Sequence, residues 1–292
     1  MSITYLKSFQ FPNEGMEWRF FMGIQRTCYD SFYPFQVLSQ RGLEKIEFEP
    51  VTILYGGNGS GKSTALNIIA DKVGAVREAA YNKSNFYPDY IKLCEMERIS
   101  EPPENLRIIT SDDVFDYMLN IRNLNEGIHQ KREDLFKEYL ESKYSDFQFH
   151  SLEDYEKLRK VNLSRSRSQS IFVRKQLMDN VREYSNGESA FRYFTEKIGK
   201  GGLYILDEPE NSLSPERQME LMEFLEDSAR FFQCQFILST HSPFLLSMRG
   251  AKIYDLDEKP VKVKRWTELK NVKAYYEFFE AHRNEFRKEK SI

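Results

Sequence analysis

The sequence has few cysteines, no long apolar run and no large excess of either charge. Its three cysteines, Cys28, Cys94 and Cys234, are far apart and form no CxxC pair, which argues against a disulfide framework and a zinc knuckle. No apolar run approaches the roughly 18 residues of a membrane-spanning helix. The N-terminal segment MSITYLKSFQFPNEGMEWRF is too polar for a signal peptide. We therefore expect a soluble, cytoplasmic protein without membrane insertion.

Basic and acidic residues nearly balance. Lysine and arginine number 42 against 45 aspartates and glutamates, which leaves a net charge of −3. This excludes the overall positive field of an obligate nucleic-acid coat protein, so any contact with DNA must be local. Hydrophobic residues make up 40% of the 292 residues and aromatic residues 14%. That content can fill a large core, and the length fits two domains or one α/β domain with a large insertion.

Short apolar runs occur in two different contexts along the chain. Within the first fifty residues, runs such as ITYLKSFQF and WRFFMGI alternate with turn residues, a pattern typical of strands and hairpins. Residues 51–55, 106–110, 203–206 and 234–240 instead form continuous apolar stretches, typical of strands buried on both faces. Predicted helices separate several of them, and alternating strands and helices predict a parallel sheet.

A glycine-rich segment follows the strand predicted at 51–55. Its sequence, GGNGSGKST, fits the pattern G-x-x-x-x-G-K-[ST] and precedes a helical pattern that stops at Gly74. Glycines let successive backbone N–H groups point at phosphates, and the helix dipole favours the anion. A chance match in a chain of this length is roughly a one-in-a-hundred event. The predicted nucleotide-binding residues are Gly56, Asn58, Gly59, Ser60, Gly61, Lys62, Ser63 and Thr64.

Individual side chains in and beyond this loop suit phosphate chemistry. Lys62 can contact the β and γ phosphates, and the Ser63 hydroxyl can ligate Mg²⁺. Asp207 and Glu208 end the strand predicted at 203–206, at the sheet edge where α/β proteins bind ligands. There Asp207 could bind Mg²⁺ and Glu208 could orient or deprotonate an attacking water. An acidic turn before a helix is the alternative interpretation.

Two further polar segments are less specific when taken alone. His241 follows the strand predicted at 234–240, and one helix and a neighbouring strand separate it from Asp207. That spacing would bring the imidazole to the γ-phosphate region, although a single histidine is usually structural. Residues 184–188 (YSNGE) precede a predicted helix, and Ser185 with Glu188 would ordinarily indicate simple helix capping.

Together these motifs resemble the ABC-type ATPase superfamily, including its soluble branch related to SMC and recombination-repair ATPases and the small stand-alone predicted ATPases of bacteria. GGNGSGKST resembles the Walker A motif, YSNGE a variant of the LSGGQ signature, LYILDEPE Walker B with its catalytic glutamate, NSLS the D-loop and STHSP the H-loop. The resemblance spans about residues 51–257. It implies an α/β P-loop NTPase fold with a mixed or parallel sheet core, N-terminal antiparallel strands and an inserted helical lobe.

The resemblance also implies how the chain is divided and how it assembles. We expect a single ATPase domain over residues 1–292, with a nucleotide-binding lobe (1–74 and 182–270), an inserted, largely helical lobe (75–181) and a C-terminal helix (271–292). ATP would bind at Lys62 in the glycine-rich loop and Mg²⁺ at Ser63 and Asp207, with Glu208 and His241 as catalytic residues. In a head-to-tail homodimer, ATP on one subunit would be capped by the other subunit's signature, Ser185, Asn186, Gly187 and Glu188.

Two positions depart from the family pattern. No glutamine occurs between Gln40 and Gln130, so the family's Q-loop glutamine has no counterpart, and the equivalent position falls at Ser111–Asp113. We expect an Asp or Ser of this segment to contact the metal or the attacking water instead, with Asp112 as the candidate metal ligand. The signature contains Asn186–Gly187 instead of two glycines, which changes the hydrogen bonds that it can offer.

The predicted function is a Mg-dependent ATPase that couples ATP binding and hydrolysis to DNA or to a soluble effector protein, in DNA maintenance or bacterial defence. The alternatives are an energy-coupling subunit of a membrane transporter and a non-hydrolysing ATP-dependent scaffold. The basic segment at 163–170, with Arg174 and Lys175, could contact nucleic acid or be a solvated loop. The aromatic stripe Tyr275, Phe279, His282 and Phe286 is expected to pack on its own domain, with docking of a partner protein as the alternative.

Overall fold

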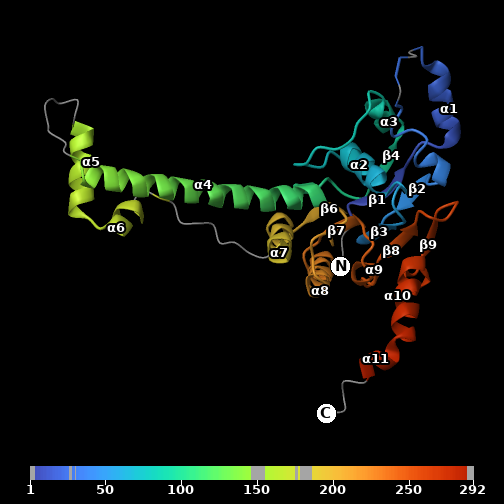
Figure 1. Cartoon of the computed structure of the whole chain (residues 1–292). Helices are drawn as coiled ribbons and strands as arrows, with labels where there is room; N and C mark the ends of the chain where they lie inside the picture. Colours follow the sequence, from blue (N-terminus) through green and yellow to red (C-terminus); the bar gives the residue numbers. More distant parts are fainter. Residues whose placement is uncertain are drawn as a thin grey trace. The chain divides into compact units, whose positions relative to one another are not determined.

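The computed structural model describes residues 4–25, 28–29, 31–145, 155–174, 177 and 186–287 (Figure 1). The chain divides into two compact units. Unit 1 comprises residues 1–115 and 186–292, and unit 2 comprises residues 116–185. Residues 75–115 thus belong to unit 1, and the division of the sequence into lobes proposed above stays a prediction.

The larger sheet of unit 1 carries the predicted site motifs. Its strands are β3 (Val51–Tyr55), β5 (Asn105–Thr110), β6 (Gly202–Asp207), β7 (Gln235–Ser239), β8 (Lys252–Asp255) and β9 (Lys262–Lys264). They are ordered β5-β6-β7-β3-β8-β9, and all neighbouring pairs are parallel except β8 and β9. Every residue of β3 and β7 is buried, because both faces of these central strands are covered. The predicted mixed or parallel sheet is confirmed.

A second, antiparallel sheet contains the N-terminal strand. It consists of β1 (Leu6–Gln10), β2 (Lys45–Glu47) and β4 (Glu95–Arg98), in the order β2-β1-β4. The buried side chain of Gln235 on β7 accepts from the backbone N–H of Leu6 at 2.9 Å and donates to its carbonyl oxygen at 2.9 Å. This amide therefore ties the antiparallel sheet to the larger one, and the predicted N-terminal antiparallel strands are confirmed.

The prediction of strands throughout the first fifty residues is wrong for two segments. Residues Glu14–Gly23, which include most of WRFFMGI, form helix α1. Residues 35–42 (FQVLSQRG) form turns and a short 3-10 helix, η1 (Ser39–Arg41). The Asn13 side chain caps α1 by accepting from the N–H of Met16 at 2.9 Å. The buried carboxylate of Glu17 then accepts from Ser39 Oγ at 2.7 Å. These contacts favour a helix over the expected strand.

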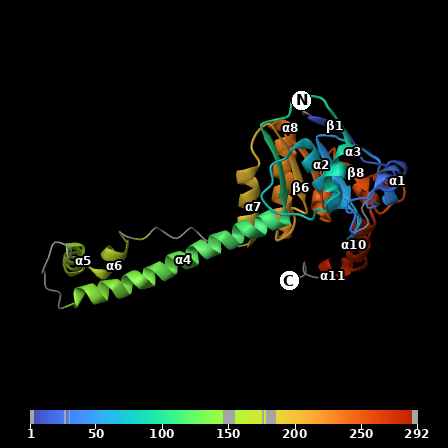
Figure 2. The same cartoon turned by 90° about the horizontal axis from the view of Figure 1, so that it is seen from above.

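Besides α1 and the C-terminal helices, unit 1 contains α2 (Lys62–Val73), α3 (Tyr87–Leu93), α7 (Asn186–Lys197), α8 (Pro215–Phe231) and α9 (Pro243–Leu246). Of these, α2, α8 and α9 follow the carboxyl ends of β3, β6 and β7, the strands that end at the site. Helix α2 packs beside β6 and β7 (Figure 2). It buries Leu66, Ile69 and Val73, and it ends as predicted at Gly74, whose φ of 82° is left-handed.

The described residues of unit 2 are mostly helical. This unit contains most of α4 (Ser111–Lys143), together with α5 (Tyr155–Ser166) and α6 (Gln169–Arg174). Its core consists of Leu135, Tyr139, Phe172 and Val173. The predicted basic segment is therefore largely helical instead of a loop. Arg165 within it donates to the carbonyl oxygen of Ser145 at 2.8 Å, and Lys175 lies outside the described residues.

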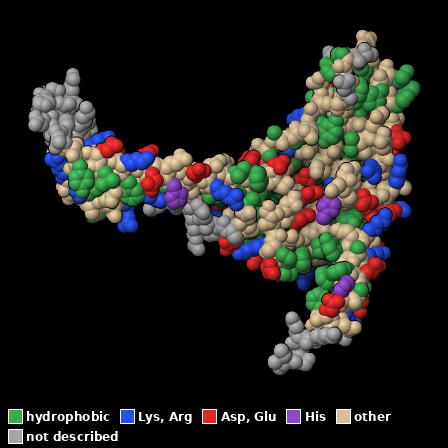
Figure 3. All heavy atoms as spheres, in the orientation of Figure 1, with side chains coloured by type: hydrophobic (Ala, Val, Ile, Leu, Met, Phe, Trp, Pro, Cys, Tyr) green, Lys and Arg blue, Asp and Glu red, His purple; other side chains and the backbone are tan. Residues whose placement is uncertain are grey.

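The C-terminal segment contains η3 (Trp266–Glu268), α10 (Lys270–Ala281) and α11 (Arg283–Arg287). The predicted packing of its aromatic stripe on the domain is wrong, because Tyr275 is 49% exposed, Phe279 53% and Phe286 67%. Figure 3 shows hydrophobic side chains at the surface of α10. The helix meets the core near its start, through the buried side chains of Leu269 and Val272.

Candidate functional site

The glycine-rich loop joins β3 to α2. Gly59 and Gly61 have left-handed backbone, with φ of 75° and 97°. At Gly61 a Cβ atom would lie 2.9 Å from Cδ2 of Leu38, so both conformation and space require glycine. Because Gly61 is the N-cap of α2 and offers no side chain to the helix, the first N–H groups of α2 are available to an anion.

A pocket of about 230 Å³ lies along this loop. Glu208 approaches it from the end of β6, so the structure brings the glycine-rich loop and the acidic strand end together as the sequence predicts. Gly56 is the one predicted nucleotide-binding residue that does not line the pocket. The lining residues are Asn58, Gly59, Ser60, Gly61, Lys62, Ser63, Thr64 and Glu208.

Lys62, Glu208 and His241 converge beside this pocket. Lys62 Nζ is 2.9 Å from His241 Nε2 and 3.8 Å from Glu208 Oε1, and His241 Nε2 is 3.4 Å from the same carboxylate oxygen. Lys62 also donates to the carbonyl oxygens of Gly56 and Gly57, at 2.8 and 3.2 Å. These groups come from the carboxyl ends of β3, β6 and β7, which are neighbours in the parallel sheet.

The protonation state of His241 follows from this environment. Burial, and then the positive charge of Lys62, lower the pKa of His241 below its ordinary 6.5. The imidazole is therefore neutral at pH 7, and Nε2 accepts from the Lys62 ammonium, which leaves the proton on Nδ1. The backbone of His241 is also fixed, because its N–H donates to Glu210 Oε1 at 2.6 Å.

Asp207 and Ser63 form the part of the site that fits a metal. Ser239 Oγ donates to Asp207 Oδ1 at 2.5 Å, and the Ser63 hydroxyl also bonds this carboxylate. Burial raises the pKa of Asp207 above 3.8 despite these bonds, so its charged form gains from a nearby cation. The described residues contain no cluster of three or more His, Cys, Asp or Glu side chains able to hold a metal. A hydroxyl and one carboxylate nevertheless suit Mg²⁺, which takes its other ligands from water and substrate phosphates.

Glu208 is held in an unusual backbone conformation. Its φ is 49°, in the left-handed region that residues other than glycine rarely adopt. Its N–H donates to the carbonyl oxygen of Ser239 at 3.2 Å, and Asn211 Nδ2 donates to its carboxylate at 3.3 Å. The side chain is 31% exposed, so water can reach the carboxylate in the pocket. Its position suits a group that orients or deprotonates water.

The segment predicted to replace the Q-loop glutamine lies at the same sheet edge. Thr110 on β5 is paired with Asp207 on β6, and α4 begins at the next residue. Asp113 has a structural role, since its carboxylate accepts from the N–H groups of Ala79 and Thr110, both at 2.7 Å. Asp112 is exposed in the first turn of α4, and its contact with metal stays a prediction.

The predicted signature lies at the start of α7. Ser185 falls outside the described residues, whereas Asn186, Gly187 and Glu188 form the first turn of this helix. Glu188 is 3.5 Å from the guanidinium of Arg217 on α8. A Cβ atom at Gly187 would lie 3.5 Å from the carbonyl oxygen of Ser212, in the predicted D-loop. None of these three residues lines the pocket beside Lys62.

Several residues around the site lie outside the Walker A, Walker B, signature, D-loop and H-loop motifs. Both carboxylate oxygens of Asp257 accept from the Gly57 N–H, at 2.9 and 3.0 Å. The Tyr33 hydroxyl donates to Thr64 Oγ1 at 3.2 Å, and Arg41 donates to the carbonyl oxygen of Gly59 at 3.2 Å. Asp257 could have been found as a polar residue after an apolar strand. The contacts of Tyr33 and Arg41 leave no comparable signal.

Two family models match parts of this chain. The family model described as "ABC transporter" matches residues 44–211, more than half of the chain. The model described as "AAA domain, putative AbiEii toxin, Type IV TA system" matches residues 180–247. A search of curated proteins found no match.

Solved structures similar to this chain include two SMC heads and an ATP-binding cassette. The SMC head domain from Thermotoga maritima is 13% identical, with a TM-score of 0.36 over 90% of this chain and 99% of that one. The SmcHead bound to the C-winged helix domain of ScpA is 14% identical, with a TM-score of 0.40 over 89% and 97%. The dimeric ATP-binding cassette MJ0796, bound to ADP and Pi, is 14% identical, with a TM-score of 0.37 over 76% and 88%.

Proposed function

This chain belongs to the ABC transporter family and is an ABC-type ATPase, and we propose that it binds Mg-ATP between two head-to-tail copies of itself. Binding and hydrolysis would be coupled to DNA or to a partner effector protein. The match of residues 180–247 to a family described by a toxin and a type IV toxin–antitoxin system supports bacterial defence as one output. DNA maintenance is the other.

The observation that carries the proposal is the convergence of Lys62, Glu208 and His241 beside the pocket of about 230 Å³ at the glycine-rich loop. In the structure Lys62 Nζ contacts two loop carbonyl oxygens and His241. ATP phosphates would compete for this ammonium group and for the N–H groups of the loop. Glu208 would orient or deprotonate the attacking water, and neutral His241 would donate to the γ-phosphate, from Nδ1–H after reorientation of the ring or from Nε2–H after a change of tautomer. Ser63 and Asp207 would hold Mg²⁺, which neutralises charge on the phosphates.

The position of the signature supports the dimer. Asn186 and Gly187 begin a twelve-residue helix, whose N-terminal N–H groups suit an anion. They do not line the pocket of their own subunit. In the proposed head-to-tail dimer, this helix start would instead approach the γ-phosphate held by Lys62 of the other copy.

Light scattering on the full chain tests the dimer. The Glu208→Gln protein should bind Mg-ATP, hydrolyse it slowly and double in mass when ATP is added. Adding Asn186→Asp should abolish this increase, because the new carboxylate would face the γ-phosphate. The aspartate introduced at position 186 would lie at a helix N-terminus, where its negative charge stabilises the fold of its own subunit by roughly 0.3–1 kcal/mol. Loss of the dimer would therefore not be due to unfolding.

Asn123→Asp provides the matched control, because Asn123 is an exposed residue on α4. It should leave the ATP-dependent dimer intact in the Glu208→Gln protein. A mass that does not depend on ATP, or an equal response in the Asn186→Asp and Asn123→Asp proteins, would refute the head-to-tail dimer.

The family name favours one further candidate, the energy-coupling subunit of a transporter. This candidate predicts that a membrane protein co-purifies with the chain in stoichiometric amount, whereas the first predicts DNA or an effector. No glutamine lies between Gln40 and Gln130 to serve in a Q-loop, which favours the first candidate. Among the described residues, no helix has both the length and the apolar character to cross a membrane.

A further inference from the structure

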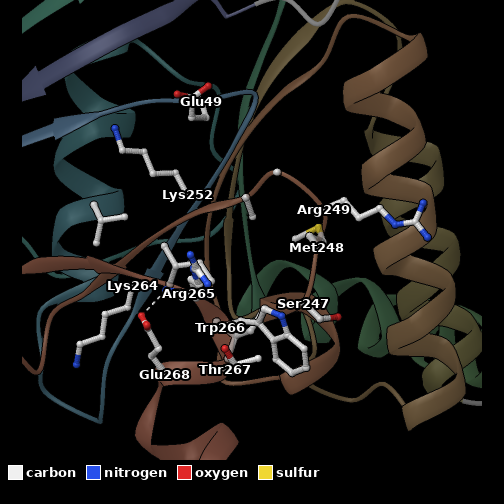
Figure 4. A pocket seen from close by; sticks show the side chains of 15 residues that line it. Glu49, Ser247, Met248, Arg249, Lys252, Lys264, Arg265, Trp266, Thr267 and Glu268 are labelled. Atoms are coloured by element: carbon white, nitrogen blue, oxygen red, sulfur yellow. Dashed lines mark hydrogen bonds between the residues drawn. The ribbon is translucent and has the colours of Figure 1, made fainter.

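Unit 1 contains a second pocket, larger than the one at the glycine-rich loop. Its volume is about 860 Å³. Two chain segments form most of its walls: residues 246–253, from the end of α9 into β8, and residues 263–268, from β9 through η3. The two pockets share no residue. Figure 4 shows the side chains around the larger one, which nothing in the proposed ATPase mechanism uses.

Cationic side chains outnumber carboxylates in this pocket. The carboxylates are those of Glu49 and Glu268. In Figure 4 Lys252 and Lys264 extend on one side of the pocket and Arg249 on the other. The lining thus has more positive than negative side chains, whereas the whole chain has a net charge of −3. The cationic residues are Arg249, Lys252, Lys264 and Arg265.

The two lysines already have acidic partners. Lys252 Nζ is 3.5 Å from a carboxylate oxygen of Glu47, and Lys264 Nζ is 2.8 Å from one of Asp255. Within the described ranges, by contrast, neither Arg249 nor Arg265 forms an ion pair. A guanidinium group without a carboxylate partner can form two parallel hydrogen bonds to a phosphate.

Arg265 is the more available of these two arginines. Arg249 also borders a neighbouring pocket that contains the acidic residues Glu223, Glu226 and Asp227 of α8, and their charge weakens its attraction for an anion. Arg265 is exposed and lies directly before Trp266. A phosphate contact is therefore expected first at Arg265.

Trp266 adds an aromatic surface to the same pocket. It begins η3 and is 39% exposed, and Figure 4 shows its indole ring in the pocket near the Ser247 side chain. The lining also includes the apolar residues Leu246, Met248 and Ile253. An accessible indole in a pocket that two arginines also line offers a stacking surface for a planar base and guanidinium groups for phosphates.

We infer that this pocket binds a single-stranded polynucleotide, with one base stacked on Trp266 and phosphates held by Arg265 and Arg249. Stacking requires an unpaired base, which a single strand offers and an intact duplex does not. An acidic peptide would match the charge but would leave the indole face without a planar partner. The inference rests on the proposed function, for which it names the nucleic-acid partner as single-stranded.

Both walls of the pocket continue into residues that fix His241. Helix α9 begins at Pro243, two residues after His241. On the other wall, η3 ends at Glu268, shortly before Asn271, whose Nδ2 donates to the carbonyl oxygen of His241 at 3.0 Å. A polynucleotide bound in the pocket would therefore contact the chain segments next to His241, the residue proposed to contact the γ-phosphate. These contacts would link the pocket to the ATP site.

Tryptophan fluorescence of the full chain tests the inference directly. The chain contains two tryptophans, so Trp18→Phe leaves Trp266 as the only reporter. Oligothymidylate and oligouridylate of about 15 nucleotides are titrated separately, without ATP, at roughly 50 mM salt. We expect saturable quenching by at least one of them. The oligonucleotide with the lower Kd tells whether the pocket prefers single-stranded DNA or RNA.

Variants locate the binding, which is measured by fluorescence anisotropy of the labelled oligonucleotide. Trp266→Ala and Arg265→Glu should each raise Kd about tenfold or more, and Trp266→Phe, which retains an aromatic face, should raise it less than about threefold. Lys92→Glu is the matched control for Arg265→Glu, because it makes the same charge change at an exposed residue of α3 outside the pocket. It should raise Kd less than about twofold.

The inference is overturned if neither oligonucleotide binds saturably, or if Trp266→Ala and Arg265→Glu both bind like the control. Equal competition by polyglutamate would also overturn it and would assign the pocket to an acidic peptide. Because the titrations contain no ATP, their result is independent of the dimer test. Oligonucleotide binding that persists when ATP fails to change the mass would refute the head-to-tail dimer alone.

Discussion

Asn271 of α10 is hydrogen-bonded to the backbone of His241: its Nδ2 donates to the His241 carbonyl oxygen at 3.0 Å. The N–H of Asn271 also donates to the hydroxyl of Tyr55, at the end of β3, at 3.2 Å. A single residue at the start of the C-terminal helix thus contacts the ends of two neighbouring strands of the site. It is a positioning residue for His241, since it touches only the backbone of that residue.

Replacing Asn271 with alanine should lower kcat for ATP hydrolysis about fivefold and leave KM nearly unchanged. Loss of one hydrogen bond costs about 1 kcal/mol, and the bond positions a group proposed to act on the γ-phosphate. Steady-state kinetics measure both constants. Asn271→Asp should reduce kcat further, because its carboxylate would repel the His241 carbonyl oxygen.

Lys273→Ala is the control for this substitution, because Lys273 is exposed on the same helix. It should leave kcat unchanged. Equal kcat values for the wild-type, Asn271→Ala and Lys273→Ala proteins would show that the hydrogen bond to His241 does not serve the reaction.

Glu208→Gln should lower kcat by a factor of about 10² or more while ATP still binds. The amide cannot accept a proton from water, yet it fits the same space and can still accept the Asn211 hydrogen bond. Single-turnover hydrolysis and equilibrium ATP binding separate the two effects. Asn211→Ala, which removes only the 3.3 Å bond to the carboxylate, should cost less than about tenfold. A Glu208→Gln enzyme with near-normal kcat would exclude Glu208 as the group that activates water.

His241 should titrate below pH 6.5, and NMR of its ring protons measures this. Burial is the first cause of the lowered pKa and the charge of Lys62 the second. Lys62→Met should therefore raise the pKa of His241 without restoring 6.5. The unfolded chain binds this proton first as the pH falls, so the fold loses stability from about pH 6.5 down to the folded pKa. A pKa that does not respond to Lys62→Met would contradict the contact between the two side chains.

The parts of the fold that could be predicted are those with an uninterrupted local signal. The buried runs at 51–55 and 203–206 become central strands, and Gly74 ends α2 as expected. Helix α1 was missed because its apolar residues resemble a strand pattern, whereas its N-cap at Asn13 and the buried Glu17 favour a helix. The partners of Glu17, Gln36 and Ser39, lie about twenty residues away in the sequence, and no local pattern reveals them.

The same distinction holds within the site. Lys62, Glu208 and His241 could be placed together because each follows an apolar strand, and the carboxyl ends of parallel strands share one sheet edge. Asn271 and Asp257 could not be assigned, since their contacts depend on how the chain returns to the site after β8. The exposed aromatic face of α10 was misjudged for a related reason: helical periodicity identifies an apolar face but does not tell what covers it.

Asp207→Asn should stabilise the protein in the absence of Mg²⁺ and abolish Mg-dependent hydrolysis. Burial raises the pKa of Asp207, so the folded state disfavours the charged form of this carboxyl group. The stability of the folded protein therefore falls as the pH rises above about 3.8. The amide removes this charge and can still accept from Ser239 Oγ. We expect thermal unfolding to show a rise in Tm of a few degrees, roughly 2–4 °C per kcal/mol. Asp71→Asn, at the partly exposed end of α2, should not raise it.

Asp257 holds the start of the glycine-rich loop. Its carboxylate oxygens accept from the Gly57 N–H at 2.9 and 3.0 Å, but its negative charge also lies close to the place proposed for the ATP phosphates. The two effects oppose each other, since the hydrogen bond orders the loop and the charge repels the nucleotide. Substitutions that remove one or both of these properties can separate the effects.

Asp257→Asn keeps an acceptor for the Gly57 N–H and removes the charge, so it should tighten ATP binding by roughly two- to fivefold. Asp257→Ala removes the acceptor as well, which leaves the loop less ordered, and should bind ATP more weakly than Asp257→Asn by about fivefold. Calorimetric titration with ATP measures the order of the three affinities. Glu258→Gln removes the same charge from the next residue, which has no bond to the loop, and should change Kd less than Asp257→Asn. If Asp257→Asn and Asp257→Ala bind ATP equally well, the hydrogen bond to Gly57 does not order the loop for nucleotide, and charge alone explains the position.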